Sequence, residues 1–217
     1  MTGSATQAWR VIVLVKGAPH GKSRLDVPGR VELSRAFARD TLAAVAASGA
    51  HLVVVTPDPD LARYAESLAA YLVADPGGGL NSAVAQALSQ AQSELGTSRA
   101  AVLLGDLPAL RAADLGAALD AAGDVPQAFV PDWAGSGTVL LADHAGNPEP
   151  SFGAGSAGRH EAAGYRRLNL DLPRLRRDVD VSADLDEVVA LGCGPHTARA
   201  LARHTPMGAG DEPTALG

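Results

Sequence analysis

The feature that most constrains the fold is an alternation of short apolar runs with longer segments of helical character, which continues through more than half of this 217-residue chain. The runs are almost continuously apolar rather than alternating with polar residues, which is typical of strands buried on both faces of a sheet. Four such strands are expected, at residues 9–15, 51–55, 71–74 and 100–104. The intervening segments predict four helices. They are expected over about 31–48, from the turn at 56–59 to about 70, over about 82–95 and over about 111–122.

Strands and helices that alternate in this way form a parallel sheet covered by helices, because each crossover returns the chain to the same end of the sheet. The sequence therefore predicts an α/β fold, a single Rossmann-like domain with a mostly parallel central sheet and helices on both faces. Further strands are expected at 128–130 and 138–141, and further helices near 156, over 183–191 and over 194–204. The domain is expected to span 9–204, with disordered termini at 1–8 and 205–217.

Charge and cysteine content exclude several classes of protein. The formal net charge of −6 argues against a general nucleic-acid binder, so any anion site must be a local basic patch. The single cysteine, Cys193, excludes an internal disulfide and a multi-cysteine metal site. No apolar run approaches the ~20 residues of a membrane-spanning helix, and the start lacks a signal-peptide pattern. We therefore expect a cytoplasmic protein.

A cationic loop follows the first predicted strand. It contains both lysines of the chain, Lys16 and Lys22, together with Arg24 and several glycines. Ligands of parallel sheets bind beyond the carboxyl ends of the strands, and a glycine-rich loop there brings N–H and ammonium groups close to an anion. The loop is therefore a candidate phosphate site, with a plain basic surface loop as the alternative. Asn81, after the third strand, and Asp106, after the fourth, are expected at the same edge.

The same loop comes close to a second phosphate-binding pattern. Residues 16–23 nearly match the P-loop pattern G-x-x-x-x-G-K-[ST], which would indicate a kinase or NTPase. Lys16 stands where that pattern requires glycine, and the chain continues into a prolyl turn at 27–29 rather than directly into a helix. A P-loop protein is therefore the less favoured alternative.

Three aspartates form a candidate metal site. Asp106 comes directly after an apolar strand, and Asp178 and Asp180 are two residues apart, so in an extended segment they face the same way. Mg²⁺ prefers carboxylates together with phosphate oxygens and water. The alternative for the later pair is a capping cluster before the helix at 183–191, for which Ser182 is the expected N-cap.

Two stretches of small residues, 135–138 and 152–156, carry hydroxyl groups. Free N–H groups around Gly153 and the hydroxyls of Thr138 and Ser156 suit a carboxylate or a phosphate. Ordinary turn chemistry is the alternative explanation for either stretch. The nearby Arg159 and His160 either add charge to this site or are solvated.

Taken together, these residues resemble the phosphoenolpyruvate / 2-phospho-L-lactate guanylyltransferases of coenzyme F420 biosynthesis. The resemblance runs from about residue 9 to residue 204, with motifs in order and at compatible spacing. The motifs are Lys16, Gly21-Lys22-Ser23-Arg24-Leu25, Leu80-Asn81, Gly105-Asp106-Leu107-Pro108, Gly137-Thr138, Phe152-Gly153, Ser156, Arg159-His160 and Asp178-Val179-Asp180. One departure is Ala154-Gly155, where relatives more often carry Pro-Asp.

The resemblance implies a GT-A-like nucleotidyltransferase fold with GTP and Mg²⁺ as requirements. It implies transfer of GMP from GTP to the phosphate of phosphoenolpyruvate, with release of pyrophosphate and formation of enolpyruvoyl-2-diphospho-5'-guanosine. The same chemistry with 2-phospho-L-lactate or 3-phosphoglycerate is the alternative. Bacterial relatives favour phosphoenolpyruvate, and the many alanines and arginines of the chain are typical of a GC-rich bacterial source. The downstream transferase that takes the unstable product is an expected partner.

The resemblance also implies a role for each candidate residue. The implied metal ligands are Asp106, Asp178 and Asp180. The implied phosphoenolpyruvate-binding residues are Thr138, Gly153 and Ser156. The implied nucleotide-binding residues are Lys16, Lys22, Arg24 and Asn81. The residues expected to act in catalysis are Lys22, Arg24 and Asp106.

Overall fold

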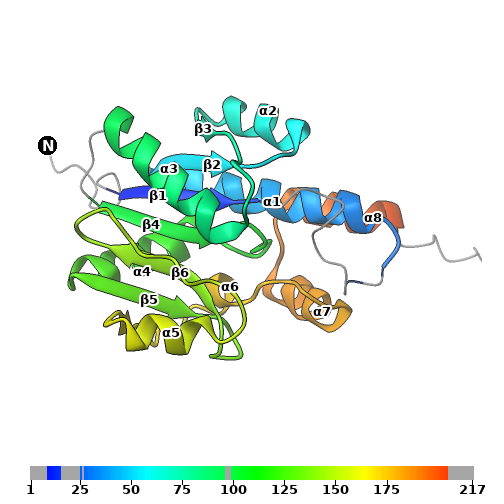
Figure 1. Cartoon of the computed structure of the whole chain (residues 1–217). Coiled ribbons are helices and arrows are strands. Elements are labelled where there is room, and N and C mark those ends of the chain that lie inside the picture. Colours follow the sequence, from blue (N-terminus) through cyan, green and yellow to red (C-terminus); the bar gives the residue numbers. More distant parts are fainter. Residues whose placement is uncertain (1–8, 16–24, 26, 96–98, 205–217) are drawn as a thin grey trace, which may run out of the picture.

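The structure, a computed structural model, describes residues 9–15, 25, 27–95 and 99–204, which form one sheet flanked by helices (Figure 1). The strands are β1 (Trp9–Leu14), β2 (His51–Val55), β3 (Tyr71–Val73), β4 (Arg99–Leu104), β5 (Gln127–Pro131), β6 (Thr138–Asp143) and β7 (Arg166–Arg167). The helices are α1 (Arg30–Ala47), α2 (Pro59–Ser67), α3 (Leu80–Leu95), α4 (Ala112–Gly123), α5 (Ser156–Ala162), α6 (Pro173–Arg176), α7 (Ser182–Leu191) and α8 (Pro195–His204). None of these helices, within the part of the chain described, is long and apolar enough to cross a membrane.

The strands form a single sheet in the order β3-β2-β1-β4-β6-β5-β7. Strands β3, β2, β1 and β4 are parallel, β6 is antiparallel to both β4 and β5, and β7 is parallel to β5. The mostly parallel sheet predicted from the sequence is therefore confirmed. Because β6 runs against the other strands, its first residue, Thr138, lies at the edge of the sheet where the parallel strands end.

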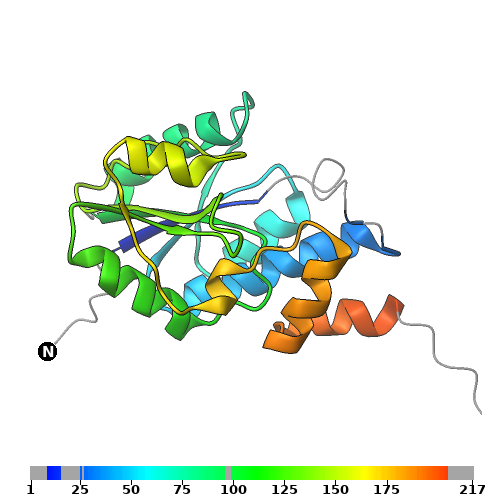
Figure 2. The same ribbon diagram turned by 90° about the horizontal axis from the view of Figure 1, so that it is seen from below.

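Helices cover both faces of the sheet, as predicted (Figure 2). In β1, Val11 and Val13 belong to a core shared with α1 and α4, whereas Ile12 and Leu14 belong to a second core shared with α3 and α5. Successive side chains of a strand point to opposite faces of the sheet. One continuous apolar run therefore supplies both cores, which is why this strand shows no polar alternation.

The C-terminal helices α7 and α8 pack on α1 (Figure 2), where Phe37 is buried together with side chains of both helices. The buried carboxylate of Asp40 in α1 accepts the backbone N–H groups of His196 and Thr197 at the start of α8, at 3.0 and 2.8 Å. A carboxylate at a helix N-terminus satisfies N–H groups that have no partner within the helix. This contact fixes the C-terminal region beside the sheet and helps to place residues 178–180 at its ligand edge.

The expected elements are present with ends that differ by at most three residues from the observed ones. Helix α6 and the two-residue strand β7 were not predicted, because elements this short have too few positions to show periodicity. The antiparallel direction of β6 was not predicted either. Strand direction depends on pairing with distant segments, which the local pattern does not encode.

Candidate active site

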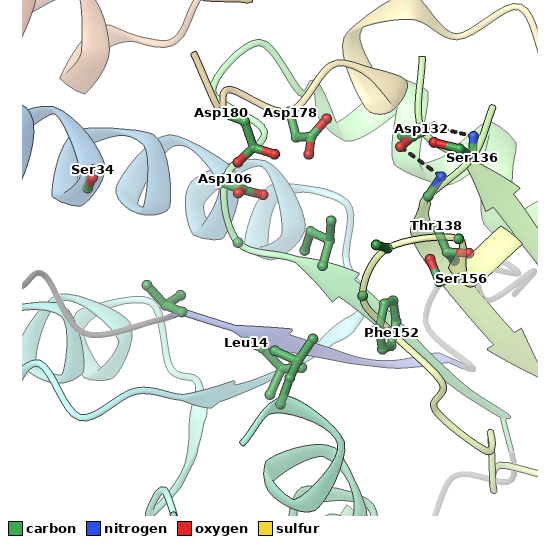
Figure 3. Close-up of a pocket in the computed structure, with 18 residues that line it drawn as sticks. Leu14, Ser34, Asp106, Asp132, Ser136, Thr138, Phe152, Ser156, Asp178 and Asp180 are labelled. Carbon is green, nitrogen blue, oxygen red and sulfur yellow. Dashed lines mark hydrogen bonds between the residues drawn. The ribbon is translucent and has the colours of Figure 1, made fainter. Parts of the chain in front are cut away.

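A cavity of about 400 Å³ opens at the edge of the sheet where the parallel strands end. Its walls come from the ends of β1 and β4, from α1 and α3, and from the segments before β6, α5 and α7. The lining residues are Leu14, Val15, Ser34, Leu80, Leu104, Gly105, Asp106, Asp132, Ser136, Gly137, Thr138, Phe152, Gly153, Ala154, Gly155, Ser156, Asp178 and Asp180. Figure 3 shows the carboxylates of Asp106, Asp178 and Asp180 on one wall and the hydroxyls of Thr138 and Ser156 on another. The cavity lies where the sequence predicts ligands to bind.

Asp106, Asp178 and Asp180 form an acidic cluster on one wall (Figure 3). One carboxylate oxygen of each residue lies within 4.8 Å of those of the other two. Carboxylates this close repel one another, and a hard cation with oxygen ligands, such as Mg²⁺, relieves that repulsion. Oxygens around one octahedral Mg²⁺ are about 3 to 4.2 Å apart, so small rotations would bring the three into place. The structure thus brings together the three predicted metal ligands.

The start of α7 is capped by a different carboxylate. Asp184 accepts the backbone N–H groups of Asp180 and Val181, both at 2.9 Å. Helix α7 already begins at Ser182, so the expected N-cap role of that serine is wrong. Asp184 thus supplies the capping carboxylate, whereas Asp178 and Asp180 line the cavity.

Asp106 is positioned by a close approach of β1 and β4. A Cβ atom added to Gly105 would lie 2.6 Å from the carbonyl oxygen of Leu14, so a side chain fits there only if the backbone shifts. On the other side of Asp106, the N–H of Leu107 donates to the hydroxyl of Thr41 in α1 at 3.0 Å. The carboxylate is therefore held between the sheet and α1.

Thr138 and Ser156 form the hydroxyl-bearing wall. They are the first residues of β6 and α5, and their exposed fractions are only 3% and 1%. The turn before β6 is fixed by Asp132, whose carboxylate accepts the N–H groups of Ser136 and Gly137 at 3.0 and 2.8 Å. Thr138 and Ser156 both line the cavity (Figure 3). Hydroxyls next to a helix start suit an anionic group.

The loop before α5 is shaped by a glycine and an arginine. Gly153 has a φ of +116°, which residues with side chains rarely adopt. The guanidinium group of Arg159 donates to the carbonyl oxygen of Ser151 at 3.1 and 2.7 Å and to that of Ala154 at 2.6 Å. Arg159 thus braces the loop, while Gly153 lines the same cavity as Ser156.

His160 is completely buried, which corrects the expectation of a charged or solvated side chain. Its Nδ1 lies 2.9 Å from the hydroxyl of Thr138, and its Nε2 accepts the N–H of Ser151 at 3.0 Å. Burial lowers the pKa of His160 from 6.5 to about 4, and the nearby Arg159 adds to this shift. The ring is therefore neutral at pH 7. The sequence offers no signal for this, because burial depends on the fold.

Asn81 is the second residue of α3. Its Oδ1 accepts the backbone N–H of Phe152 at 3.2 Å, so the start of α3 is joined to the loop before α5. Its neighbour Leu80, and not Asn81, lines the cavity. The role of Asn81 in nucleotide binding stays a prediction.

The basic loop after β1 falls outside the described residues. Lys16, Lys22 and Arg24 all belong to it, so their phosphate contacts remain predictions. Val15 immediately before the loop lines the cavity, which agrees with the expectation that the loop begins at the ligand edge.

Two polar residues of the cavity were not predicted. Asp132 follows β5 directly, and the signal that identified Asp106, a carboxylate immediately after an apolar strand, would also have found it. Ser34 is in α1 and reaches the cavity from the side of the acidic cluster (Figure 3). A serine in a long helix carries no distinguishing pattern, so only the packing of α1 against the sheet edge reveals it.

Solved structures with the same fold include nucleotide-using enzymes. The Rv0371c protein from Mycobacterium tuberculosis aligns with a TM-score of 0.58 and 18% identity, over 86% of this chain and 99% of the other. A nucleotidyl transferase from Methanothermobacter thermautotrophicus aligns with a TM-score of 0.55 and 15% identity, over 84% and 98% of the two chains. At these identities the likeness shows the fold alone, and it confirms the predicted nucleotidyltransferase fold.

Sequence comparison is more specific. The model of the MobA-like NTP transferase domain matches residues 21–180. Phosphoenolpyruvate guanylyltransferases from Streptomyces avermitilis and Salinispora arenicola are both 46% identical, over 90% and 89% of this chain and 94% and 93% of their own lengths. These matches leave no place for the P-loop alternative. The chain belongs to the MobA-like NTP transferases and, within them, to the phosphoenolpyruvate guanylyltransferase family.

Proposed function

We propose that this nucleotidyltransferase transfers GMP from GTP to the phosphate of phosphoenolpyruvate, which releases pyrophosphate and forms enolpyruvoyl-2-diphospho-5'-guanosine. The observation that carries the proposal is that two walls of one cavity can each bind an anionic substrate, one through a metal ion and the other through hydroxyl groups. The acidic cluster of Asp106, Asp178 and Asp180 suits a metal-bound triphosphate, and the hydroxyls of Thr138 and Ser156 suit a second anion. Family membership supports the choice of the two substrates.

In this reaction an oxygen of the acceptor phosphate attacks the α-phosphorus of GTP. The bond from that phosphorus to the oxygen bridging the β-phosphate breaks, and its electron pair leaves with pyrophosphate. The attacking phosphate is already an anion at pH 7, so no protein base or covalent nucleophile is required. The protein contributes orientation of the two substrates and compensation of their charge.

The proposed acceptor site is the wall formed by Thr138, Gly153 and Ser156. The two nearly buried hydroxyls can donate to carboxylate or phosphate oxygens without the competition of bulk water. Gly153 lacks a side chain, so its backbone can approach the ligand closely. Phosphoenolpyruvate carries both a carboxylate and a phosphate, which gives this wall two groups to orient.

The proposed metal ligands are Asp106, Asp178 and Asp180, whose all-oxygen donor set fits Mg²⁺. When bound, Mg²⁺ supplies charge compensation for the α-phosphoryl group and for the departing pyrophosphate. On the opposite side of the triphosphate we assign Lys22 and Arg24 to the β- and γ-phosphates. Lys16 would contact the nucleotide where β1 ends.

Pyrophosphate release tests the proposal. The protein is incubated with GTP and Mg²⁺ and with phosphoenolpyruvate, 2-phospho-L-lactate or 3-phosphoglycerate in turn. The expected result is release with phosphoenolpyruvate that stops when the metal is chelated. If pyrophosphate is released only with another acceptor, that compound replaces phosphoenolpyruvate in the proposal. If none of the three acceptors gives release, the proposed function is wrong. Substitution of ATP or CTP for GTP tests the choice of guanine in the same assay.

The place of this reaction in coenzyme F420 biosynthesis follows as part of the same proposal, as do a cytoplasmic location and a handover of the product to the next transferase. A mixed anhydride of an enol phosphate is prone to hydrolysis, so its rapid consumption would be advantageous. Loss of F420 fluorescence after deletion of the gene is the expected result, and unchanged fluorescence would remove the protein from that pathway.

A further inference from the structure

His160 occupies a closed site behind the acceptor wall. The side chain has no exposed surface and lies against the rings of Phe152, Tyr165 and Phe129, with ring centroids 5.5, 5.7 and 6.1 Å away. Such a site is costly for a polar ring unless both nitrogens find partners. Both do, and each nitrogen meets one specific group.

The partner of Nε2 fixes the tautomer. The backbone N–H of Ser151 points to Nε2 at 3.0 Å, and a backbone N–H can only donate. Nε2 must therefore be an acceptor and carries no hydrogen. A neutral imidazole has one hydrogen, so it resides on Nδ1. The charged form would place two N–H groups face to face at Ser151.

The tautomer in turn fixes the direction of the hydroxyl of Thr138. Nδ1 lies 2.9 Å from the Oγ1 atom of Thr138, so Nδ1–H donates and Oγ1 accepts. The hydroxyl hydrogen then has to point away from His160. Within the described part of the chain no other side-chain hydrogen bond of Thr138 occurs, and the residue lines the cavity. Its O–H is thus available as a donor to a ligand.

We propose that His160 is a positioning residue that orients the hydroxyl of Thr138 as a hydrogen-bond donor to an anionic oxygen of the acceptor substrate. In the opposite tautomer Thr138 would donate to the ring and present oxygen lone pairs to the cavity, which would repel an anion. His160 therefore makes this wall selective for carboxylate or phosphate over a group that donates hydrogen bonds. The identity of the anion rests on the proposed function, whereas the tautomer does not.

His160 and Arg159 also hold the backbone of the loop that contributes Gly153 to the acceptor wall. His160 holds the N–H of Ser151, and Arg159, the preceding residue of α5, holds the carbonyl oxygens of Ser151 and Ala154. One turn of α5 therefore fixes both the donor direction at Thr138 and the backbone that leads to Gly153. A change at His160 is expected to act on acceptor binding and not on nucleotide binding.

The first experiment is NMR of the full-length protein labelled with ¹⁵N at its six histidines, at pH 7 and without substrates. The signals of His160 are identified by their absence in His160→Gln. An unprotonated Nε2 and a protonated Nδ1 are expected. A hydrogen on Nε2, or a charged ring, would overturn the proposal. This measurement needs no activity, so it stays informative if the proposed function fails.

The second experiment is kinetic and compares two amide replacements. An asparagine amide reaches about the position of Nδ1, and a glutamine amide about that of Nε2. His160→Gln should raise KM for phosphoenolpyruvate about 10- to 100-fold, the effect of losing a hydrogen bond to a charged group, while kcat and KM for GTP stay within about threefold. His160→Asn, which can still donate to Thr138, should recover part of this loss.

A double variant distinguishes an effect on the orientation of the Thr138 hydroxyl from a general structural effect of the substitution at His160. If His160 acts through the Thr138 hydroxyl, Thr138→Val should resemble His160→Gln, and the two changes combined should be no worse than Thr138→Val alone. Independent losses, or losses shared equally by kcat and KM for GTP, would overturn the proposal. Thermal unfolding of each variant confirms that the comparison is made on folded protein.

Discussion

The side chain of Asn81, at the start of α3, accepts the backbone N–H of Phe152 through its Oδ1 atom at 3.2 Å. This single hydrogen bond joins the segment that follows β3 to the loop that carries Gly153. It therefore connects the side of the cavity expected to receive the nucleotide with the acceptor wall.

Asn81→Ala tests which of these sides depends on the residue. Loss of the bond should free the loop and raise KM for phosphoenolpyruvate several-fold, at a cost in stability of about 1 kcal/mol. Asn81→Asp, which keeps an acceptor oxygen, should restore most of the affinity. A change confined to KM for GTP would instead support the role in nucleotide binding predicted from the sequence. Initial rates with each substrate varied in turn distinguish the two outcomes.

Gly105→Ala should destabilise the protein and displace Asp106. The added methyl group would meet the carbonyl oxygen of Leu14 at 2.6 Å, and backbone in a paired sheet moves only at a cost of about 1–3 kcal/mol. The matched control is Gly158→Ala in α5, where the new methyl group meets nothing within 4 Å. That change should be neutral or stabilising by up to about 1 kcal/mol. Urea unfolding measures both, and equal effects would contradict the steric argument.

Asp106→Asn and Asp178→Asn should each lower metal-dependent pyrophosphate release at least about 100-fold, because several kcal/mol of charge compensation is lost. The control is Asp186→Asn, the same chemical change at an exposed position of α7, which should retain activity within about twofold. Circular dichroism of the variants should be unchanged. Near-normal turnover of Asp106→Asn would exclude it as a metal ligand.

The buried His160 predicts a loss of stability in mild acid. Its pKa is about 4 in the folded protein and 6.5 when unfolded, so as the pH falls through this interval the unfolded chain takes up the proton first. The native state should lose up to about 3 kcal/mol between pH 6.5 and 4, and no more below. The groups facing the ring are Thr138 and Ser151, with the Arg159 cation nearby and the Tyr165 phenol, whose pKa is raised by burial.

The measurement is the free energy of unfolding of the wild type minus that of His160→Gln, as a function of pH. Subtraction removes the contributions of other titrating groups. The difference should fall as the pH is lowered through this interval. Curves that remain parallel from pH 7 to 4 would mean that the histidine is not held neutral by the fold.

Much of the architecture could be predicted from local pattern. Largely apolar runs identified the central strands because a parallel sheet buries both of its faces, as the division of β1 between two cores shows. Asp106 was recognisable because a carboxylate directly after such a strand must face the ligand edge. The juxtaposition of Asp178 and Asp180 with Asp106 came from the family resemblance and the spacing of the pair.

The relations that remained hidden depend on contacts between distant segments. His160 gave no sign of burial, because its closed site is assembled from β5, β6, the loop at 152 and Tyr165. The cap of α7 was assigned to Ser182 by residue preference, but the carboxylate found at the helix start is that of Asp184, which accepts the N–H groups of Asp180 and Val181. Local propensity thus predicted a cap at the start of α7 but not the residue that provides it.

The docking of α8 onto Asp40 also makes the acidic cluster depend on the last part of the chain to be synthesised. Asp106 follows β4 of the central sheet, whereas Asp178 and Asp180 precede α7 and α8, which pack on α1. A nascent chain that has completed its sheet would still lack two of the three predicted metal ligands in their final place. The acidic cluster on which the proposed reaction depends is therefore complete only in a chain whose C-terminal helices have docked.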